Sequence, residues 1–121
     1  MSYMLLIIEP PEQRRTRTEE EGREVYARMQ HFGEALRAQG KLKAMESLAS
    51  QASAVRVSKP GGKALLRDGP FAEAKEMVGG FFLLDGVDRN EALAIAQQCP
   101  AAEWATVEVR PLAPCFDDSH A

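Results

Sequence analysis

Val78–Leu84 (VGGFFLL) and Tyr3–Ile8 (YMLLII) are the two unbroken apolar runs that decide the fold. Runs of this length without polar alternation are typical of strands that are buried on both faces, in the middle of a sheet. The stretches between and after them are more polar and carry helical or alternating patterns. The sequence therefore predicts two central strands, and the other elements are placed around them.

The first helix is expected over Glu19–Gln39. Thr18 and Glu21 make a capping box, in which each side chain satisfies a free amide at the helix start, and Gly40 supplies the left-handed residue that ends it. The apolar side chains fall on one stripe at helical spacing: Val25, Met29, Phe32 and Leu36. His31 lies roughly 130° from the centre of that stripe, so we expect it on the surface.

The remaining elements complete a split βαβ pattern. Asp88 is placed to cap a second helix that stops at Pro100. Two extended segments around the turn Lys59–Gly62 predict a hairpin, and alternation over residues 105–110 predicts the last strand. The order favours an α+β, ferredoxin-like fold: an antiparallel sheet with two helices on one face and an inserted β-hairpin.

Composition excludes several function classes. With 15 basic and 18 acidic side chains the net charge is −3, whereas nucleic-acid-binding domains normally have a basic surplus. The basic run Arg14–Arg17 is followed at once by glutamates, so we interpret it as a solvated segment. No stretch approaches the ~20 apolar residues of a membrane span, and Cys99 and Cys115 form no disulfide or metal-binding pattern. We expect a cytoplasmic protein without nucleic-acid or membrane partners.

Motifs for cofactor chemistry are absent as well. The sequence has no dinucleotide fingerprint, no phosphate-binding loop, no nucleophile elbow and no zinc-protease motif. The Gly79-Gly80 pair opens a strand and not a helix, so it is no phosphate loop. We therefore expect no cofactor and no metal.

One segment carries a resemblance to a known family. Asp68–Glu76 (DGPFAEAKE), followed by Gly79–Phe81, resembles the signature of the DGPF group in the YCII-related family. Three further segments resemble that group in the same order: residues 3–7, 46–48 and 107–111. The resemblance implies a single YCII-related domain over residues 1–112, with a C-terminal tail over 113–121. It also implies a dimeric α/β-barrel type of ferredoxin-like fold, in which a homodimer forms through the open sheet faces and leaves a pocket between sheet and partner.

Some members of the family carry a His in the first helix and an Asp near the end of the second, proposed as a catalytic pair. Counted from the end of each helix, those positions are Met29 and Cys99 in this chain. The proton-transfer mechanism that the resemblance implies therefore lacks its two usual groups here.

The candidate site lies around the Asp68–Phe71 turn. Asp68 is either a turn residue that bonds nearby amides or a general base held by a stiff turn. Lys75 and Glu76 are either a solvated ion pair or part of a pocket, in which Lys75 holds an anionic substrate and Glu73 or Glu76 moves a proton. The site prediction assigns Asp68 and Glu76 as catalytic, and Phe71, Lys75 and Arg110 as ligand-binding.

Two further features keep their alternatives open. Gly79-Gly80 inside a strand indicates either a bulge or a close approach by a ligand or another backbone. Arg110 and Glu108 share the polar side of the last strand, where they either make salt bridges in a dimer or line the pocket with Glu9. His120 lies in the tail and carries no functional expectation.

Two functions are compatible with these residues. The first is a homodimer that binds an unknown small molecule and acts as a cofactor-free enzyme of the proton-transfer, lyase or isomerase type. The alternative is a non-catalytic binding or regulatory module, linked to alternative sigma factor systems as the resemblance implies.

Overall fold

The computed structural model describes residues 1–117, which form a four-stranded sheet, two α-helices and a separate hairpin. The sheet order is β2-β5-β1-β6 and every neighbouring pair is antiparallel. The strands of the sheet are β1 (Ser2–Glu9), β2 (Leu42–Ser47), β5 (Met77–Asp85) and β6 (Thr106–Pro111). The two unbroken apolar runs are β1 and β5, and they occupy the centre as predicted. This order is consistent with a ferredoxin-like α+β fold.

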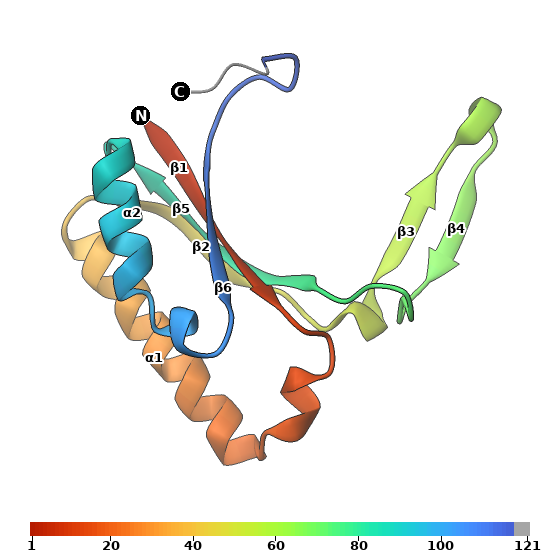
Figure 1. The fold of residues 1–121 in the computed structure, drawn as a ribbon, viewed down its shortest axis with the longest axis horizontal. Coiled ribbons are helices and arrows are strands. Elements are labelled where there is room, and N and C mark those ends of the chain that lie inside the picture. The colour runs from red at the N-terminus through yellow and green to blue at the C-terminus, as the bar shows by residue number, and fades with distance from the viewer. Residues whose placement is uncertain (118–121) are drawn as a thin grey trace.

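Both helices pack on one face of the sheet (Figure 1). They are α1 (Glu19–Ala38) and α2 (Arg89–Gln98). The predicted capping box is formed, since the Thr18 hydroxyl accepts from the Glu21 amide and the Glu21 carboxylate accepts from the Thr18 amide. Asp88 caps α2 by accepting from the Glu91 amide. Gly40 takes the left-handed conformation at φ 72°.

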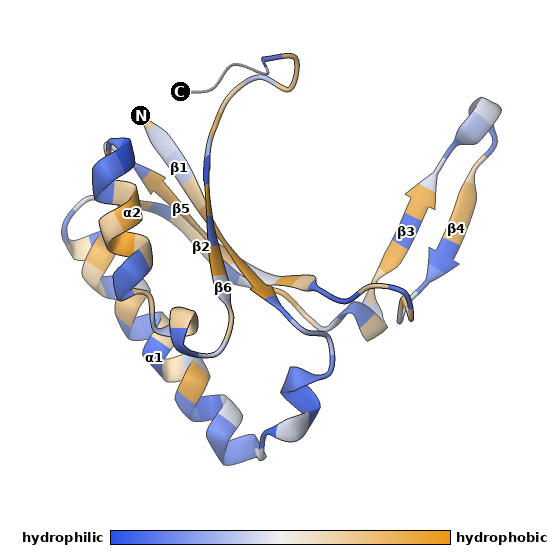
Figure 2. Cartoon of the chain, in the orientation of Figure 1, coloured by the Kyte–Doolittle hydropathy of each residue, from blue (hydrophilic) through white to orange (hydrophobic). Residues whose placement is uncertain are grey.

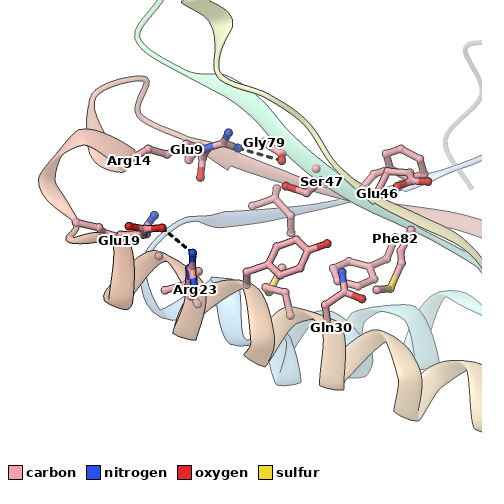
Figure 3. A pocket seen from close by; sticks show the side chains of 18 of the residues that line it. Glu9, Arg14, Glu19, Arg23, Gln30, Glu46, Ser47, Gly79 and Phe82 are labelled. Carbon is pink, nitrogen blue, oxygen red and sulfur yellow. Dashed lines mark hydrogen bonds and ion pairs between the residues drawn. The ribbon is translucent and has the colours of Figure 1, made fainter.

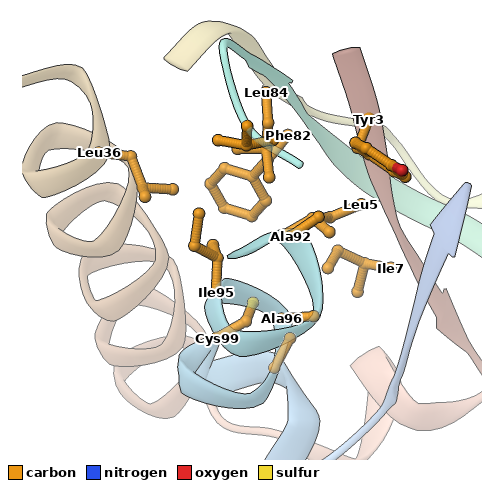
Figure 4. Close-up of a cluster of buried hydrophobic side chains, with 12 residues drawn as sticks. Tyr3, Leu5, Ile7, Leu36, Phe82, Leu84, Ala92, Ile95, Ala96 and Cys99 are labelled. Atoms are coloured by element: carbon orange, nitrogen blue, oxygen red, sulfur yellow. The ribbon is translucent and has the colours of Figure 1, made fainter. Parts of the chain in front are cut away.

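The core lies between the helices and the helix-facing side of β1 and β5 (Figure 4). Along β1, the buried side chains alternate with partly exposed ones, so every second residue faces the helices. The fully buried residues there are Tyr3, Leu5, Ile7, Phe82 and Leu84. Leu36 of the predicted stripe is buried against them, while Met29 and Phe32 pack at the edge of the core. His31 is exposed, as its angular position predicted.

The opposite side of the sheet, here called the open face, has no layer over it in the described chain (Figure 1). Its central side chains are apolar and half-buried: Met4, Leu6, Ile8, Phe81 and Leu83. The edge strand β6 adds Thr106, Glu108 and Arg110, which are exposed as its alternation predicted. The central strands are therefore buried on one face within a single chain, and not on both.

The inserted hairpin stands away from the sheet as an arm, residues 54–68 (Figures 1 and 2). Its strands β3 (Val55–Ser58) and β4 (Leu65–Asp68) pair only with each other. The prediction of a hairpin is confirmed, and its strands lie within two residues of the expected positions. All eight strand residues are exposed.

Beyond β6, residues 112–117 form no helix or strand. The start of the tail at residue 113 stays a prediction, and the last part of the tail, with His120, lies outside the described residues. Within residues 1–117, no helix combines the length and the hydropathy that crossing a bilayer needs.

Candidate functional site

A cavity of about 530 Å³ lies between the first half of α1 and the sheet, at the end where β1 meets the start of β5 (Figure 3). Ligand pockets in proteins commonly have volumes of about 300–1,000 Å³. Apolar side chains from both layers line it: Ile7, Val25, Met29, Met45 and Phe82. Tyr26, Gln30 and Ser47 add polar groups. Within the apolar stripe of α1, Phe32 and Leu36 therefore pack against the core, while Val25 and Met29 line this cavity.

Glu9 is the one buried charged residue in the described chain, with 5% of its surface exposed. It ends β1 in the same alternating set as Tyr3, Leu5 and Ile7, so its side chain points to the helix side of the sheet. Its Oε1 accepts a hydrogen bond of 2.7 Å from Nε of Arg14. A buried carboxylate needs such a partner, because an unpaired one would lose its hydration without compensation.

Arg14 connects three segments of the chain at the cavity. It sits in the short 3-10 helix Gln13–Thr16 (η1). Beyond its bond to Glu9, its Nη1 donates to the Leu48 carbonyl at 2.7 Å and its Nη2 to the Gly79 carbonyl at 3.2 Å. The interpretation of the basic run as solvated is wrong for Arg14, because the planar guanidinium holds η1, the end of β2 and the start of β5 together.

The Gly79-Gly80 pair is explained by close approaches. The β1–β5 register shifts between Ile7 and Ile8, which pair with Gly80 and Val78, so Gly79 is the extra residue of a bulge. A Cβ on Gly79 would lie 2.6 Å from Oε1 of Glu9. A Cβ on Gly80 would lie 2.8 Å from the carbonyl oxygen of Glu46 in β2. Both predicted alternatives hold: there is a bulge, and the carboxylate and a neighbouring backbone need the space.

The second oxygen of the Glu9 carboxylate, Oε2, accepts no hydrogen bond from the described residues, and it is not among their enclosed, unpartnered atoms. Glu9 itself lines the cavity. The side chain therefore presents one fixed, partly desolvated acceptor to a largely apolar space.

The charges around the cavity balance. Three acidic residues line it (Glu9, Glu19 and Glu46), and so do three basic ones (Arg14, Arg17 and Arg23). Two of these pairs are direct ion pairs, Glu9 with Arg14 and Glu19 with Arg23, each at 2.7 Å. The cavity thus carries no net charge that would draw in a strongly charged ligand.

Met29 and Cys99, which stand where the resemblance implies a His and an Asp, lie in different surroundings. Met29 lines the cavity. Cys99 is 2% exposed within the core, and this burial raises the pKa of its thiol. A thioether carries no exchangeable proton, and a thiol with a raised pKa stays protonated near neutral pH. Neither side chain is suited to proton transfer.

None of the five residues predicted for the site lines the cavity. Asp68 is exposed at the end of β4, where it pairs with Val55. Phe71 is 3% exposed and lies under the arm, with the guanidinium carbon of Arg56 at 3.8 Å and that of Arg67 at 5.0 Å from its ring centre. Arg67 and Arg56 also form ion pairs with Glu73.

Gly69 is required in this turn because a side chain would not fit there. Its φ is not positive. A Cβ at this position would collide with the carbonyl oxygen of Gln51, and the Gly69 amide donates to the Ala54 carbonyl at 2.8 Å. The turn therefore packs tightly against the segment where the arm leaves the body, which is the chain outside residues 54–68.

Lys75, Glu76 and Arg110 are exposed and are not brought together. Arg110 pairs loosely with Glu108 at 3.7 Å and borders a shallow hollow on the open face. This contact lies within one chain, and a salt bridge of Arg110 in a dimer stays a prediction. The assignment of Asp68 and Glu76 as catalytic, and of Phe71, Lys75 and Arg110 as ligand-binding, stays a prediction.

Sequence reasoning placed Glu9 in the wrong cluster and missed the role of Arg14. The signal for Glu9 was its position in the strand. It follows Tyr3, Leu5 and Ile7 at every second residue, so its side chain had to lie on the helix side of the sheet and not on the side of Arg110. Arg14 gave no such signal, because a turn after a double proline sets its direction. Among residues 1–117, no group of three or more His, Cys, Asp and Glu side chains is arranged to hold a metal ion.

Comparison with known proteins places this arrangement in a family. An uncharacterised protein of Rhizobium meliloti (strain 1021) is 40% identical over 76 residues, a match that spans 61% of each chain. The model of the YCII-related domain matches residues 1–115, slightly beyond the expected limit at residue 112. The chain therefore belongs to the YCII-related domain family.

Proposed function

We propose that this protein binds a small, neutral, mostly apolar organic molecule with one hydrogen-bond donor in the cavity beneath α1. The observation that carries the proposal is Glu9: its side chain is buried and is fixed by Arg14 through Oε1, while Oε2 accepts no hydrogen bond from residues 1–117. A buried acceptor gains most when a ligand donates to it, because hydrogen bonds to charged groups contribute about 1.5–3 kcal/mol.

The class of ligand follows from the lining. The apolar walls suit a compact hydrocarbon or aromatic body, and the three acidic and three basic residues cancel. An anion would meet the Glu9 carboxylate, and a ligand without a donor would leave Oε2 unpaired after displacing water. Either mismatch costs affinity, since desolvated polar groups must find partners.

Proton transfer is the second candidate activity. The fixed Glu9 carboxylate beside the cavity favours it, because a general base must be held within reach of its proton. Met29 and Cys99 weigh against the mechanism that the family resemblance implies. Non-catalytic binding, including a regulatory role, is therefore the function we favour. A site built on Asp68, Phe71, Lys75, Glu76 and Arg110 is kept as a separate proposal.

The protein is also proposed to be a homodimer through its open face, as in the dimeric α/β-barrel arrangement. The half-buried apolar centre of that face, formed by Met4, Leu6, Ile8, Phe81 and Leu83, supports this, because a sheet normally covers its second apolar face. The two free cysteines fit a reducing compartment, which supports a cytoplasmic location.

Three matched probes test the ligand class: benzyl alcohol, benzyl methyl ether and benzoate. They share one aromatic body and differ in donor and charge. In a titration followed by ¹H–¹⁵N spectra, we expect benzyl alcohol to move the amide signals of Gly79 and of the first half of α1. The ether should bind about tenfold more weakly, because it cannot donate. Equal binding of all three, or tightest binding of benzoate, would contradict the proposed class.

A further inference from the structure

The arm, residues 54–68, has a face that nothing in the described chain covers. Residues directly opposite each other on paired strands share a face, so Val57 and Leu66 lie on one side of the hairpin, and Arg56 and Arg67 on the other. The arginine side is turned toward the body, since both guanidinium groups lie over the Phe71 ring. The far side is therefore the free one.

That free side is mostly apolar: besides Asp68, which lies opposite Val55, it carries three apolar side chains. Val55, Val57 and Leu66 are 51%, 62% and 69% exposed. Figure 2 shows hydrophobic colouring along parts of β3 and β4, on an arm that projects clear of the sheet and helices. An isolated two-stranded hairpin is at best marginally stable in water, and an exposed apolar hairpin invites association. The arm thus has the properties of a docking element and not of a solvated loop.

The charge of the arm indicates what covers it. Residues 54–68 carry four basic side chains and one acidic one, so the arm has a net charge of +3, while the rest of the chain has −6. Arg56 and Arg67 share Glu73 at the base. Lys59 and Lys63, near the tip, form no ion pair with the described residues. The missing partner is therefore both acidic and partly apolar.

We infer that the arm docks on the body of a second copy of this chain. The body supplies the negative charge, and its open face supplies apolar surface. In a two-fold dimer the contact occurs twice, because each arm meets the body of the other copy and the assembly closes. The inference rests on the proposed dimer and adds the arms to its interface.

Two single substitutions on the same hairpin test the arm. Leu66→Glu places a charge on the free apolar side. Ser58→Glu adds the same charge to the adjacent strand, on the opposite side of the hairpin. Sedimentation equilibrium at micromolar concentration should give a dimer dissociation constant at least about tenfold higher for Leu66→Glu, and one within about twofold of the wild type for Ser58→Glu. The ¹H–¹⁵N spectrum of the body should remain that of the folded protein in both.

The outcomes separate the two proposals. A wild-type dimer that Leu66→Glu leaves unchanged overturns the arm contact and leaves the sheet-face dimer standing. A wild type that stays monomeric at about 100 micromolar overturns both the arm contact and the sheet-face dimer. In a mixed sample of labelled and unlabelled chains, nuclear Overhauser contacts from the Val57 and Leu66 methyl groups to the other copy should appear. Contacts only within one chain would contradict the inference.

Discussion

The Asp68–Phe71 turn and the Glu9–Arg14 ion pair are both rigid parts of this protein, but their rigidity has different consequences. The turn packs a buried aromatic ring under two arginines and fastens an arm to the body. The pair holds one carboxylate at the wall of a cavity and leaves an oxygen of it unpartnered. Stiffness alone thus does not mark a binding site. Our proposal rests instead on a fixed polar atom that no residue of 1–117 partners, at the wall of a cavity.

The largest expected effect is on the stability of the body, compared with that of the arm. Phe32 packs edge-to-face on Phe82, with ring centres 5.2 Å apart, so Phe32→Ala should lower the free energy of unfolding of the whole body by about 3 kcal/mol. Phe71→Ala removes a more deeply buried ring, but we expect it to speed hydrogen exchange in the arm while the body melts nearly as before. Denaturant unfolding and amide exchange measure the two.

A control for this comparison is His31→Ala. The side chain is exposed on α1, so the change in stability should stay below about 0.5 kcal/mol. If Phe71→Ala destabilised the body as strongly as Phe32→Ala, the arm and body would unfold as one cooperative unit. The expected difference in stability between them would then be contradicted.

The next effect concerns the Glu9–Arg14 ion pair at the cavity. Arg14→Met keeps much of the side chain's length but removes the guanidinium that faces Glu9 and two carbonyls. Leaving one partner of a fully buried pair costs about 3–5 kcal/mol. Arg14 is about one-third exposed, so we expect a loss nearer 2 kcal/mol, measured by chemical denaturation.

The double variant Glu9→Gln/Arg14→Met sharpens this test. Removing both charges should recover part of the stability lost in Arg14→Met, because no unpaired carboxylate remains. A double variant as unstable as the sum of the two single variants would mean that the pair is not coupled.

A smaller effect is expected at the bulge. A Cβ on Gly79 would meet the Glu9 carboxylate and, at 3.0 Å, Nη2 of Arg14. Both are side-chain ends that can shift, so Gly79→Ala should cost about 1–2 kcal/mol and weaken binding in the cavity. Gly22→Ala is the matched control, since nothing lies within 4 Å of a Cβ there although Gly22 also lines the cavity.

The smallest effect is a pH dependence confined to the arm. The hydrogen bond from Arg67 lowers the pKa of the Glu73 carboxyl, with a further contribution from its own backbone amide. A depressed carboxyl pKa stabilises the folded arm above the ordinary pKa of glutamate, and this stabilisation is lost as the pH falls below about 4. Arm amide shifts should therefore change on acidification before the body unfolds. In Glu73→Gln this early change should be absent.

The fold was largely predictable because its signals are local. The apolar runs of β1 and β5, the Thr18–Glu21 capping box and the Lys59–Gly62 turn each specify their own element. The pairing of these elements then follows from the split βαβ order. The arm's position was not predictable, because its strands pair only with each other and the contacts at its base join residues far apart in sequence.

The site was harder to predict for a physical reason. The Asp68–Phe71 motif stands out in the sequence because a tight turn restricts its residue types. Glu9 and Arg14 are ordinary charged residues near a double proline, and their role depends on a bulge in β5 and on the carbonyls of Leu48 and Gly79. Only the folded chain brings these groups together.

We propose that the ligand of the cavity binds at Glu9, and a separate site at Asp68 is the competing proposal. Titration of benzyl alcohol into the wild type, Glu9→Gln and Asp68→Asn, followed by ¹H–¹⁵N spectra, tests it most directly. We expect shifts at Gly79, Gly80 and the first half of α1 in the wild type, an affinity about tenfold lower in Glu9→Gln, and an unchanged affinity in Asp68→Asn. Shifts centred on the Asp68–Phe71 turn, or an affinity lost in Asp68→Asn and kept in Glu9→Gln, would contradict it.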